Sequence, residues 1–303
     1  MIEFADRVAV VTGAGGGLGR QHALLLASRG AAVVVNDPGT AVDGSGAQTR
    51  AADQVVAEIT AAGGRAVAEH SSVATRAGGE ALVAAAIEKF GRLDIVINNA
   101  GILRDKSFHK LEEGDLRAVI DVHLLGAFFV TQPAWVHMRE QGYGRVVLTS
   151  SASGVLGNFG QSNYAAAKMG LVGLLNVLKL EGAKYNIKVN AIAPIAVTRM
   201  TEAMLATFGI SAEHFDPANV AAPVAYLASE ACGISGELWS VGGGSVSRMF
   251  VGLADGFFKH PREGTLTLED IETNLERIRS TEPFLVPASN QDEFAKLGAK
   301  LFG

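Results

Sequence analysis

Cysteine, basic charge and long apolar runs are all scarce in this chain. Its 303 residues include one cysteine, Cys232, which excludes a disulfide framework and fits a reducing compartment. A formal net charge of −5 argues against a nucleic-acid-binding surface. No apolar run approaches the roughly 20 residues that cross a bilayer, and residues 1–7 do not resemble a signal peptide. We therefore expect a soluble cytoplasmic protein that binds neither nucleic acid nor membrane.

Apolar residues are abundant, and they follow an alternating βα order. They make up 48% of a chain that is long enough to bury a sizeable core. Strands are expected at 8–11, 32–35, 66–68, 95–97, 146–148, 189–192 and 237–241. Helices are expected near 18–29, 50–62, 76–90, 113–139, 161–185 and 217–229. Most strands lack polar/apolar alternation, so we predict an α/β, doubly wound Rossmann fold with a seven-stranded parallel sheet flanked by helices.

Two helical segments, which begin at Leu116 and Met169, are apolar on more than one side. One side should meet the sheet, and the other needs a second cover. We expect that cover to be the same helices of a partner chain, in a homodimer or a homotetramer.

The composition changes near residue 250. A short apolar stretch leads into a helix pattern at 268–280, then P-F-L-V-P and a final short helix. This segment is too small for a domain. We predict a catalytic domain over residues 1–249 and a helical extension over 250–303, packed on the main body or on a partner subunit.

A glycine-rich loop, T-G-A-G-G-G-L-G from Thr12 to Gly19, separates the first strand from the next helix. Glycines let the backbone approach a pyrophosphate, and the helix N-terminus offers unpaired N–H groups. Asp37 ends the second strand, where a carboxylate can bind both ribose hydroxyls and repel a 2′-phosphate. The pattern predicts NAD rather than NADP as cofactor.

Residues that could do chemistry follow the later strands. N-N-A-G, from Asn98 to Gly101, follows the fourth strand, and Ser151 follows the fifth. Tyr164 and Lys168 share one helix face. Y-x-x-x-K is common by chance, but its position after a fifth parallel strand favours a site. Lys168 would lower the Tyr164 pKa, so that Tyr164 takes a hydroxyl proton while Ser151 stabilises charge on the substrate oxygen.

With these motifs in this order, residues 7–245 resemble the short-chain dehydrogenase/reductase family. The resemblance implies that Tyr164 is the general base or acid, Lys168 its partner and Ser151 the ligand of the substrate oxygen. It implies no metal site. The cofactor-binding residues that it implies are Gly13, Gly17, Leu18, Gly19, Asp37, Ser72, Val73, Asn99, Ala100, Gly101, Tyr164, Lys168 and Thr198.

Two positions depart from the general family pattern. His123 stands where most members have an Asn that helps to hold a relay water, so it is a candidate catalytic residue or a packed core residue. The usual P-G-x-x-x-T is A-P-I-A-V-T here, shorter by one residue before Thr198. Thr198 is still expected to meet the carboxamide of the nicotinamide.

These departures, with G-I-L-R-D-K-S-F and G-N-F-G-Q-S-N-Y, resemble the branch that forms the (3R)-hydroxyacyl-CoA dehydrogenase units of peroxisomal multifunctional enzymes of type 2. The resemblance implies oxidation of a (3R)-hydroxyacyl-CoA to the 3-oxoacyl-CoA with NAD. Apolar residues in 198–215 suit a lid over an acyl chain or sterol, or ordinary packing. Arg104, Lys106 and Lys110 could meet CoA phosphates or be solvated surface charge.

Other functions stay open. A steroid or other secondary-alcohol dehydrogenase, including one for steroid side-chain thioesters, shares the same motifs. An NADPH-dependent 3-oxoacyl reductase is disfavoured by Asp37. A non-catalytic NAD sensor is disfavoured because Tyr164 and Lys168 are both present.

Overall fold

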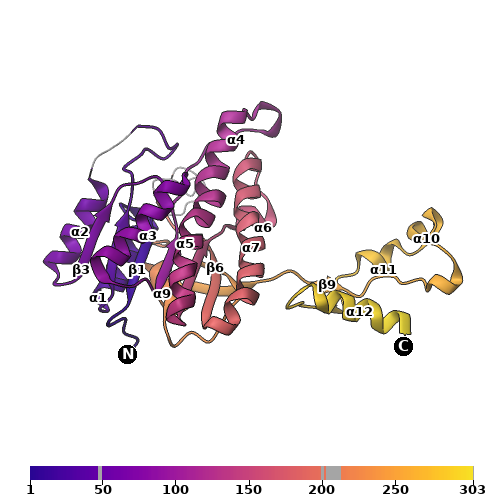
Figure 1. Ribbon diagram of the computed structural model, residues 1–303. Coiled ribbons are helices and arrows are strands. Elements are labelled where there is room, and N and C mark those ends of the chain that lie inside the picture. Colours follow the sequence, from indigo (N-terminus) through magenta and orange to yellow (C-terminus); the bar gives the residue numbers. More distant parts are fainter. Residues whose placement is uncertain (47–49, 199–200, 203–212, 303) are drawn as a thin grey trace. The chain divides into compact units, whose positions relative to one another are not determined.

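The computed structural model describes residues 1–46, 50–198, 201–202 and 213–302 (Figure 1). It divides into two units, Met1–Arg248 and Met249–Gly303. The first holds the sheet and the glycine loop. The second holds a two-stranded ribbon and short helices.

One eight-stranded sheet organises the first unit, in the order β3-β2-β1-β4-β5-β6-β7-β8. All pairs from β3 through to β7 are parallel. The direction of winding reverses between β1 and β4, as in a doubly wound fold, which confirms the predicted architecture. The strands are β1 (Val8–Thr12), β2 (Ala32–Asn36), β3 (Arg65–Glu69), β4 (Ile95–Asn98), β5 (Gly144–Thr149), β6 (Ile187–Ile195), β7 (Leu238–Gly242) and β8 (Ser245–Met249).

The eighth strand is absent from the sequence-based prediction of seven. It follows β7 after only Gly243 and Gly244, whose positive φ values of +55° and +79° are typical of tight hairpin turns. All but its last residue are exposed, so β8 lacks the apolar pattern that reveals the buried strands.

Helices cover both faces of this sheet (Figure 1). On one face α1 packs against α2 and α9, and on the other α3 packs against α5. Buried Val, Ile and Ala side chains of β1, β2 and β4 form the core between the layers. The helices of this unit are α1 (Gly17–Ser28), α2 (Ala51–Ala61), α3 (Arg76–Phe90), α4 (Glu113–Ile120), α5 (Gly126–Gln141), α6 (Ala152–Leu156), α7 (Ser162–Gly182) and α9 (Ala218–Ala228).

The longest helical run, Glu113–Gln141, joins α4, a π-helical turn at Asp121–Leu125, and α5. By length and composition it could cross a membrane, which corrects the expectation that no segment reaches that length. It packs on α3, α7, β4 and β5, as a core helix of a doubly wound sheet does. Its outer side and that of α7 expose apolar residues, namely Leu116, Leu125, Phe128, Val136, Met169, Val177 and Leu180.

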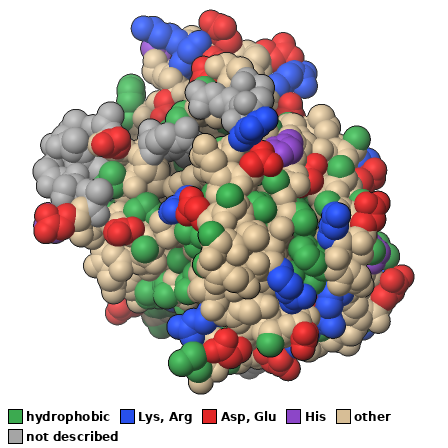
Figure 2. Space-filling view, turned by 90° about the vertical axis from the view of Figure 1, so that its left-hand side faces the viewer, with side chains coloured by type: hydrophobic (Ala, Val, Ile, Leu, Met, Phe, Trp, Pro, Cys, Tyr) green, Lys and Arg blue, Asp and Glu red, His purple; other side chains and the backbone are tan. Residues whose placement is uncertain are grey.

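Charge of both signs is spread over the face of the molecule seen in Figure 2. Acidic, basic and apolar side chains are intermixed there. The charges on this face therefore favour neither an anionic nor a cationic partner.

The second unit has no buried residue within the described range 249–302. β9 (Leu253–Ala254) pairs antiparallel with β10 (Phe284–Leu285), beside α10 (Leu268–Thr273), α11 (Leu275–Arg279) and α12 (Asn290–Phe302). Ion pairs between Lys259 and Asp270 and between Lys300 and Asp255 stabilise it locally. Its apolar side chains, including Phe250, Leu268, Phe294 and Phe302, are exposed within this unit.

Candidate functional site

The glycine loop between β1 and α1 is held by the carboxyl end of β4. The Thr12 hydroxyl accepts hydrogen bonds from the N–H groups of Asn99 (2.9 Å) and Ala100 (3.0 Å). The Asn99 amide donates to the carbonyls of Thr12 (3.0 Å) and Gly13 (3.1 Å). A Cβ on Gly19 would lie 2.3 Å from the Gly13 carbonyl oxygen, so only glycine fits there. N-N-A-G thus sets the shape of the phosphate loop.

Asp37 lies against this loop, as the sequence predicts. The Gly15 N–H donates to Asp37 Oδ2 at 2.9 Å, and the Gly39 N–H donates to Oδ1 at 2.7 Å. A Cβ on Gly15 would lie 2.7 Å from Asp37 Oδ2. The bare backbone and the fixed carboxylate fit the pyrophosphate and adenosine ribose of a dinucleotide.

Of the remaining predicted cofactor residues, Gly17, Leu18 and Thr198 lie at the same loop. Gly17 opens α1 with φ +51°, directly before Leu18, and a Cβ on it would lie 3.6 Å from the Thr198 methyl group. Ser72 follows β3, and its hydroxyl accepts the Ala74 N–H at 3.3 Å. Most of the predicted lid, residues 203–212, lies outside the described residues.

A small cavity, about 10 Å³ in volume, lies between these segments and α7. Val73, Ala100, His123 and Lys168 line it, together with Thr12 and Asn98. A space of this size holds about one water molecule. Two predicted cofactor residues and two predicted catalytic residues therefore meet around one small polar space.

Ser151, Tyr164 and Lys168 come together at the carboxyl end of β5. Ser151 is the N-cap of α6, and its oxygen accepts the Ser153 N–H at 3.1 Å. Its side chain lies near the Tyr164 hydroxyl and lowers the pKa of that phenol. Lys168 Nζ lies 5.5 Å from the centre of the Tyr164 ring and donates to the Thr149 carbonyl at 2.5 Å.

Burial dominates the proton affinities of these groups. It lowers the pKa of Lys168 to about 7. It also raises the pKa of Tyr164, with a further rise from the Asp105 charge and a partial offset from the Ser151 hydrogen bond. The pKa of Tyr164 is thus raised by its burial, whereas the sequence predicted that Lys168 would lower it.

Comparisons with known proteins agree with this arrangement. The family profile of the short chain dehydrogenases matches residues 7–207. This chain is a short-chain dehydrogenase. The family consists of oxidoreductases that act on CH–OH groups. The carboxyl edge of the sheet, which carries Ser151, Tyr164 and Lys168 and is here named the reactive edge, is the candidate site for that chemistry.

Individual relatives cover most of this dehydrogenase. It is 56% identical over 244 residues to a putative short-chain type dehydrogenase/reductase, Rv0148, of Mycobacterium tuberculosis, with 80% of this chain and 85% of the relative covered. It is 48% identical to mouse peroxisomal multifunctional enzyme type 2, over 91% of this chain and 37% of that enzyme. It is 38% identical to the hydroxyacyl-CoA dehydrogenase ChsB1 of M. tuberculosis, over 88% and 89%.

A solved structure shows the same fold. Full-length peroxisomal multifunctional enzyme type 2 from Drosophila melanogaster matches with a TM-score of 0.82 and 36% identity, over 99% of this dehydrogenase and 50% of that chain. These matches confirm the resemblance to the type 2 multifunctional enzymes. The dehydrogenase spans at most half of the length of those enzymes.

His123 occupies the π-helical turn and faces both the N-N-A-G segment and Tyr164. Its Nε2 lies 3.0 Å from the Ile102 nitrogen and 2.8 Å from the Ile102 carbonyl oxygen. Its ring meets the Tyr164 ring edge-on at 5.1 Å between centres. A Cβ on Gly101 would lie 2.4 Å from the imidazole, so glycine there makes room for it.

The His123 imidazole is held neutral. Burial, and then the Lys168 charge, lower its pKa well below the ordinary value. Its Nδ1 is buried and has no hydrogen-bond partner among the described residues. One ring nitrogen, Nε2, therefore contacts the Ile102 backbone, and Nδ1 has no hydrogen-bond partner among the described residues.

The basic side chains proposed for CoA phosphates are engaged with a carboxylate. Arg104 and Lys106 both pair with Asp115, at 3.6 Å and 2.8 Å. Lys110 is exposed in a short 3₁₀ helix, Phe108–Lys110. This arrangement favours a structural role for Arg104 and Lys106.

The loop after β4 is also attached to the segment before Tyr164, which the sequence did not predict. Gln161 Nε2 donates to Asp105 Oδ2 at 2.7 Å, and Asn163 Nδ2 donates to the Arg104 carbonyl at 3.0 Å. The only signal was the pair of strings R-D-K and G-Q-S-N-Y, which carried the family resemblance without revealing this contact.

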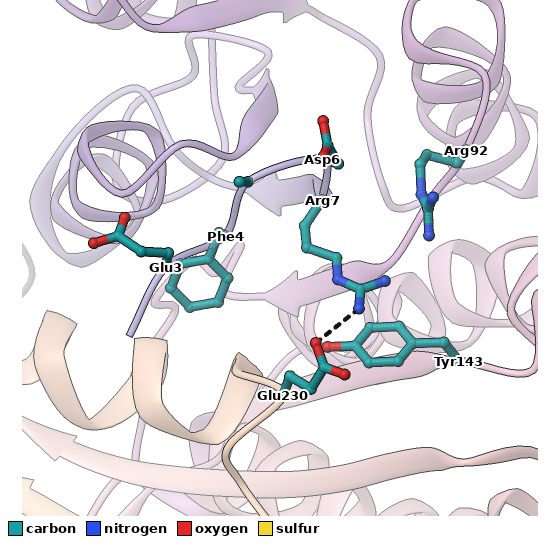
Figure 3. Close-up of a pocket in the computed structure, with 8 residues that line it drawn as sticks. Glu3, Phe4, Asp6, Arg7, Arg92, Tyr143 and Glu230 are labelled. Atoms are coloured by element: carbon teal, nitrogen blue, oxygen red, sulfur yellow. Dashed lines mark hydrogen bonds and ion pairs between the residues drawn. The ribbon is translucent and has the colours of Figure 1, made fainter. Parts of the chain in front are cut away.

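A larger pocket, about 310 Å³ in volume, lies at the opposite edge of the sheet (Figure 3). It lies before β1, β4 and β5 and is lined by charged residues together with Phe4, Ala5 and Tyr143. Arg7 pairs there with Glu230 at 3.0 Å and with the buried Asp94 at 3.1 Å. Paired charges around a tyrosine ring indicate a structural cluster, separate from the reactive edge.

Proposed function

We propose that this chain oxidises a (3R)-hydroxyacyl-CoA to the 3-oxoacyl-CoA with NAD as acceptor. The observation that carries the proposal is the convergence of Ser151, Tyr164 and the buried Lys168 at the carboxyl end of β5. The likeness to a hydroxyacyl-CoA dehydrogenase supports the substrate class. The resemblance to the type 2 multifunctional enzymes supports the 3R configuration.

NAD rather than NADP fits the adenosine end of the site. The Asp37 carboxylate is fixed against the glycine loop, and a carboxylate there would repel the 2′-phosphate of NADP. The glycine loop has no basic side chain from Thr12 to Gly19. Arg20, the next basic residue, is paired with Glu58.

Three side chains would carry out the proton transfer. When bound, NAD supplies the hydride acceptor and a positive charge on its oxidised ring. Tyr164 Oη, as phenolate, accepts the proton of the substrate hydroxyl. The Ser151 hydroxyl donates to the same substrate oxygen and holds it in reach of Tyr164. Lys168 Nζ would hold the nicotinamide ribose while its position is fixed by the Thr149 carbonyl.

His123 acts on this site chiefly as a positioning residue. Its Nε2 fixes the backbone of Ile102, and its ring packs on the edge of Tyr164. A relay role would use the unpartnered Nδ1 or the water-sized cavity beside Lys168. Solvent isotope effects on turnover of His123→Asn separate the two, because a relay residue changes the proton-transfer step and a positioning residue does not.

A homodimer fits the exposed apolar side of the long helical run and of α7. Leu125, Phe128 and Val136 on the run are exposed, and so are Val177 and Leu180 on α7. A second copy would bury these side chains at about 25 cal/mol per Å² of apolar surface. Sedimentation of Phe128→Glu tests this, since a charge in an apolar interface should yield monomers while wild type stays dimeric.

The decisive test of the function is NADH absorbance with (3R)- and (3S)-hydroxyacyl-CoA thioesters. We expect turnover of the 3R isomer with NAD and at least tenfold less with NADP. Equal rates with both isomers, or turnover of free sterols without CoA, would refute the acyl-CoA proposal in favour of a general alcohol dehydrogenase. A strong NADPH preference would indicate a 3-oxoacyl reductase.

A further inference from the structure

Two consecutive residues at the carboxyl end of β5 each hold one part of Lys168. The Thr149 carbonyl accepts a hydrogen bond from Lys168 Nζ at 2.5 Å. The Ser150 hydroxyl donates to the backbone carbonyl of Lys168 at 2.8 Å. The side chain and the main chain of this lysine are therefore both attached to the end of β5, directly before Ser151.

Ser150 is fixed by the sheet as well as by the helix. Its N–H donates to the Ile192 carbonyl of β6 at 2.7 Å, which continues the pairing of β5 with β6 beyond Thr149. Only 1% of Ser150 is exposed. A buried hydroxyl without a partner is costly, so Ser150 favours the one arrangement in which it reaches the Lys168 carbonyl.

A close approach of α6 to α7 accompanies this hydrogen bond. A Cβ on Gly154 would lie 2.9 Å from the Lys168 Cβ and 2.9 Å from the Met169 nitrogen, so a larger residue would have to move one of the two helices. Ser151 is the N-cap of α6. The start of α6 and the middle of α7 are thus held together by a steric contact and by the Ser150 hydrogen bond.

The attachment at Lys168 also bears on Tyr164. The two residues lie about one turn apart on α7, so a hydrogen bond to the Lys168 main chain restrains both. Among the described residues no carboxylate holds the Lys168 amine, which leaves the end of β5 to fix its position. A reacting group that is misplaced by about 1 Å can lose about 10²-fold in rate.

We propose that Ser150 is a positioning residue that holds Tyr164 and Lys168 in register with Ser151. The proposal rests on the roles that the proposed function gives to these three side chains. Ser150 acts through the Lys168 carbonyl, which already uses its hydroxyl proton. Loss of this hydroxyl would let α7 shift along the end of β5 and separate the reacting groups from Ser151.

Ser150→Ala tests the proposal, and Ser229→Ala is its matched control. Ser229 is also buried, and its hydroxyl donates to the Tyr226 carbonyl at 2.7 Å. It lies at the amino edge, where its carbonyl accepts from Arg145. We expect similar falls in the urea midpoint, because each variant loses one buried hydrogen bond. Only Ser150→Ala should lower kcat, by about tenfold or more.

Binding of the reduced cofactor gives a readout that needs no substrate. Lys168 Nζ is proposed to hold the nicotinamide ribose, whereas AMP carries only the adenosine and one phosphate, for which Asp37 and the glycine loop are proposed. We expect Ser150→Ala to raise the Kd for NADH at least threefold and to leave the Kd for AMP unchanged, both by calorimetry. Ser229→Ala should change neither value.

Gly154→Ala tests the same register from α6. Its added Cβ must push α6 and α7 apart, so we expect a lower kcat and a higher Kd for NADH, as in Ser150→Ala. Gly114→Ala in α4 is the control, because a Cβ there meets no atom within 4 Å. It should change neither quantity.

Three results would overturn the proposal. The first is an unchanged kcat and an unchanged Kd for NADH in Ser150→Ala. The second is an equal loss of kcat in Ser229→Ala, which would make the effect one of stability alone. The third is a parent that does not bind NADH, which would refute the cofactor as well. A parent that binds NADH but oxidises neither hydroxyacyl-CoA isomer refutes the proposed substrate only, and the Kd values then decide the role of Ser150.

Discussion

The two edges of one sheet bury charge in opposite ways. At the amino edge, the carboxylate of Asp94 is fully buried and accepts from Arg7, Arg92 and the Val8 N–H. At the carboxyl edge, Lys168 is buried against a carbonyl alone, with no carboxylate partner among the described residues. The buried charge at the amino edge is therefore paired with opposite charges, whereas the buried amine at the carboxyl edge is not.

A buried charge with partners contributes to stability, whereas a buried charge without an opposite charge can take part in chemistry. The buried Asp94 carboxylate has its hydrogen bonds supplied by two arginines and a backbone N–H, so this cluster contributes to stability rather than to ligand binding. An unpaired buried amine instead has a pKa near neutrality and can respond to a bound molecule. The reactive edge is therefore recognisable by the charge that it does not satisfy.

Removing the Tyr164 hydroxyl should have the largest effect. Tyr164→Phe lacks the atom that exchanges the proton, and general acid–base catalysis contributes roughly 10²–10⁴-fold to rate. We expect kcat to fall by about that factor while NAD binding, measured by calorimetry, is kept. Asp37 and the glycine loop, which are proposed to hold the adenosine half of NAD, are unchanged in this variant. Undiminished turnover would disprove the assigned base.

Breaking the amino-edge cluster should instead change stability. Asp94→Asn leaves Arg7 and Arg92 without their shared carboxylate, and removing one partner of a buried pair costs about 3–5 kcal/mol. Urea unfolding at pH 7 measures this. The exposed pair of Arg117 and Glu113 provides the control, since Glu113→Gln should cost under about 1 kcal/mol.

The sequence predicted the sheet, and it predicted that Ser151, Tyr164 and Lys168 would come together, because both depend on local patterns. Each parallel strand is an apolar run of a few residues, and the motifs follow those runs directly. Ser151, Tyr164 and Lys168 needed only the rule that parallel strands end at one edge.

What the sequence missed depends on long-range contacts. The Gln161 amide bonds the Asp105 carboxylate across 56 positions of the chain. The burial that raises the Tyr164 pKa likewise depends on the folded packing around the phenol. β8 was missed for a different reason, because it is exposed. No sequence pattern distinguishes the π-helical turn at His123 from a regular α-helix.

Replacing the unsatisfied amine should stabilise the protein while ending its activity. The Lys168 pKa is depressed to about 7 in the folded state, so the unfolded chain binds more protons between pH 7 and its ordinary value of 10.5. Stability from this group therefore rises with pH across that window. We expect Lys168→Met to be about 1–4 kcal/mol more stable at pH 7, with a smaller gain at pH 9.5, by urea midpoints. Equal gains at both values would contradict the depressed pKa.

A buried titratable group outside both clusters should affect stability only in acid. His22 in α1 is fully buried, has no partner for either ring nitrogen among the described residues, and burial lowers its pKa to about 3. The unfolded chain protonates at the ordinary 6.5, so the protein should lose stability as pH falls from 6.5 towards 3, by up to about 1.4 kcal/mol per pH unit for this group.

His22→Leu removes that group and keeps an apolar side chain in its place. Its unfolding free energy should fall less steeply than wild type between pH 6.5 and 4.5, with His123 accounting for part of the remaining slope. At pH 8 the variant should be at least as stable as wild type, because two unsatisfied ring nitrogens are gone. If the unfolding free energies of the two proteins fall equally with pH, His22 has a hydrogen-bond partner in solution. Buried groups without partners would then be confined to the reactive edge.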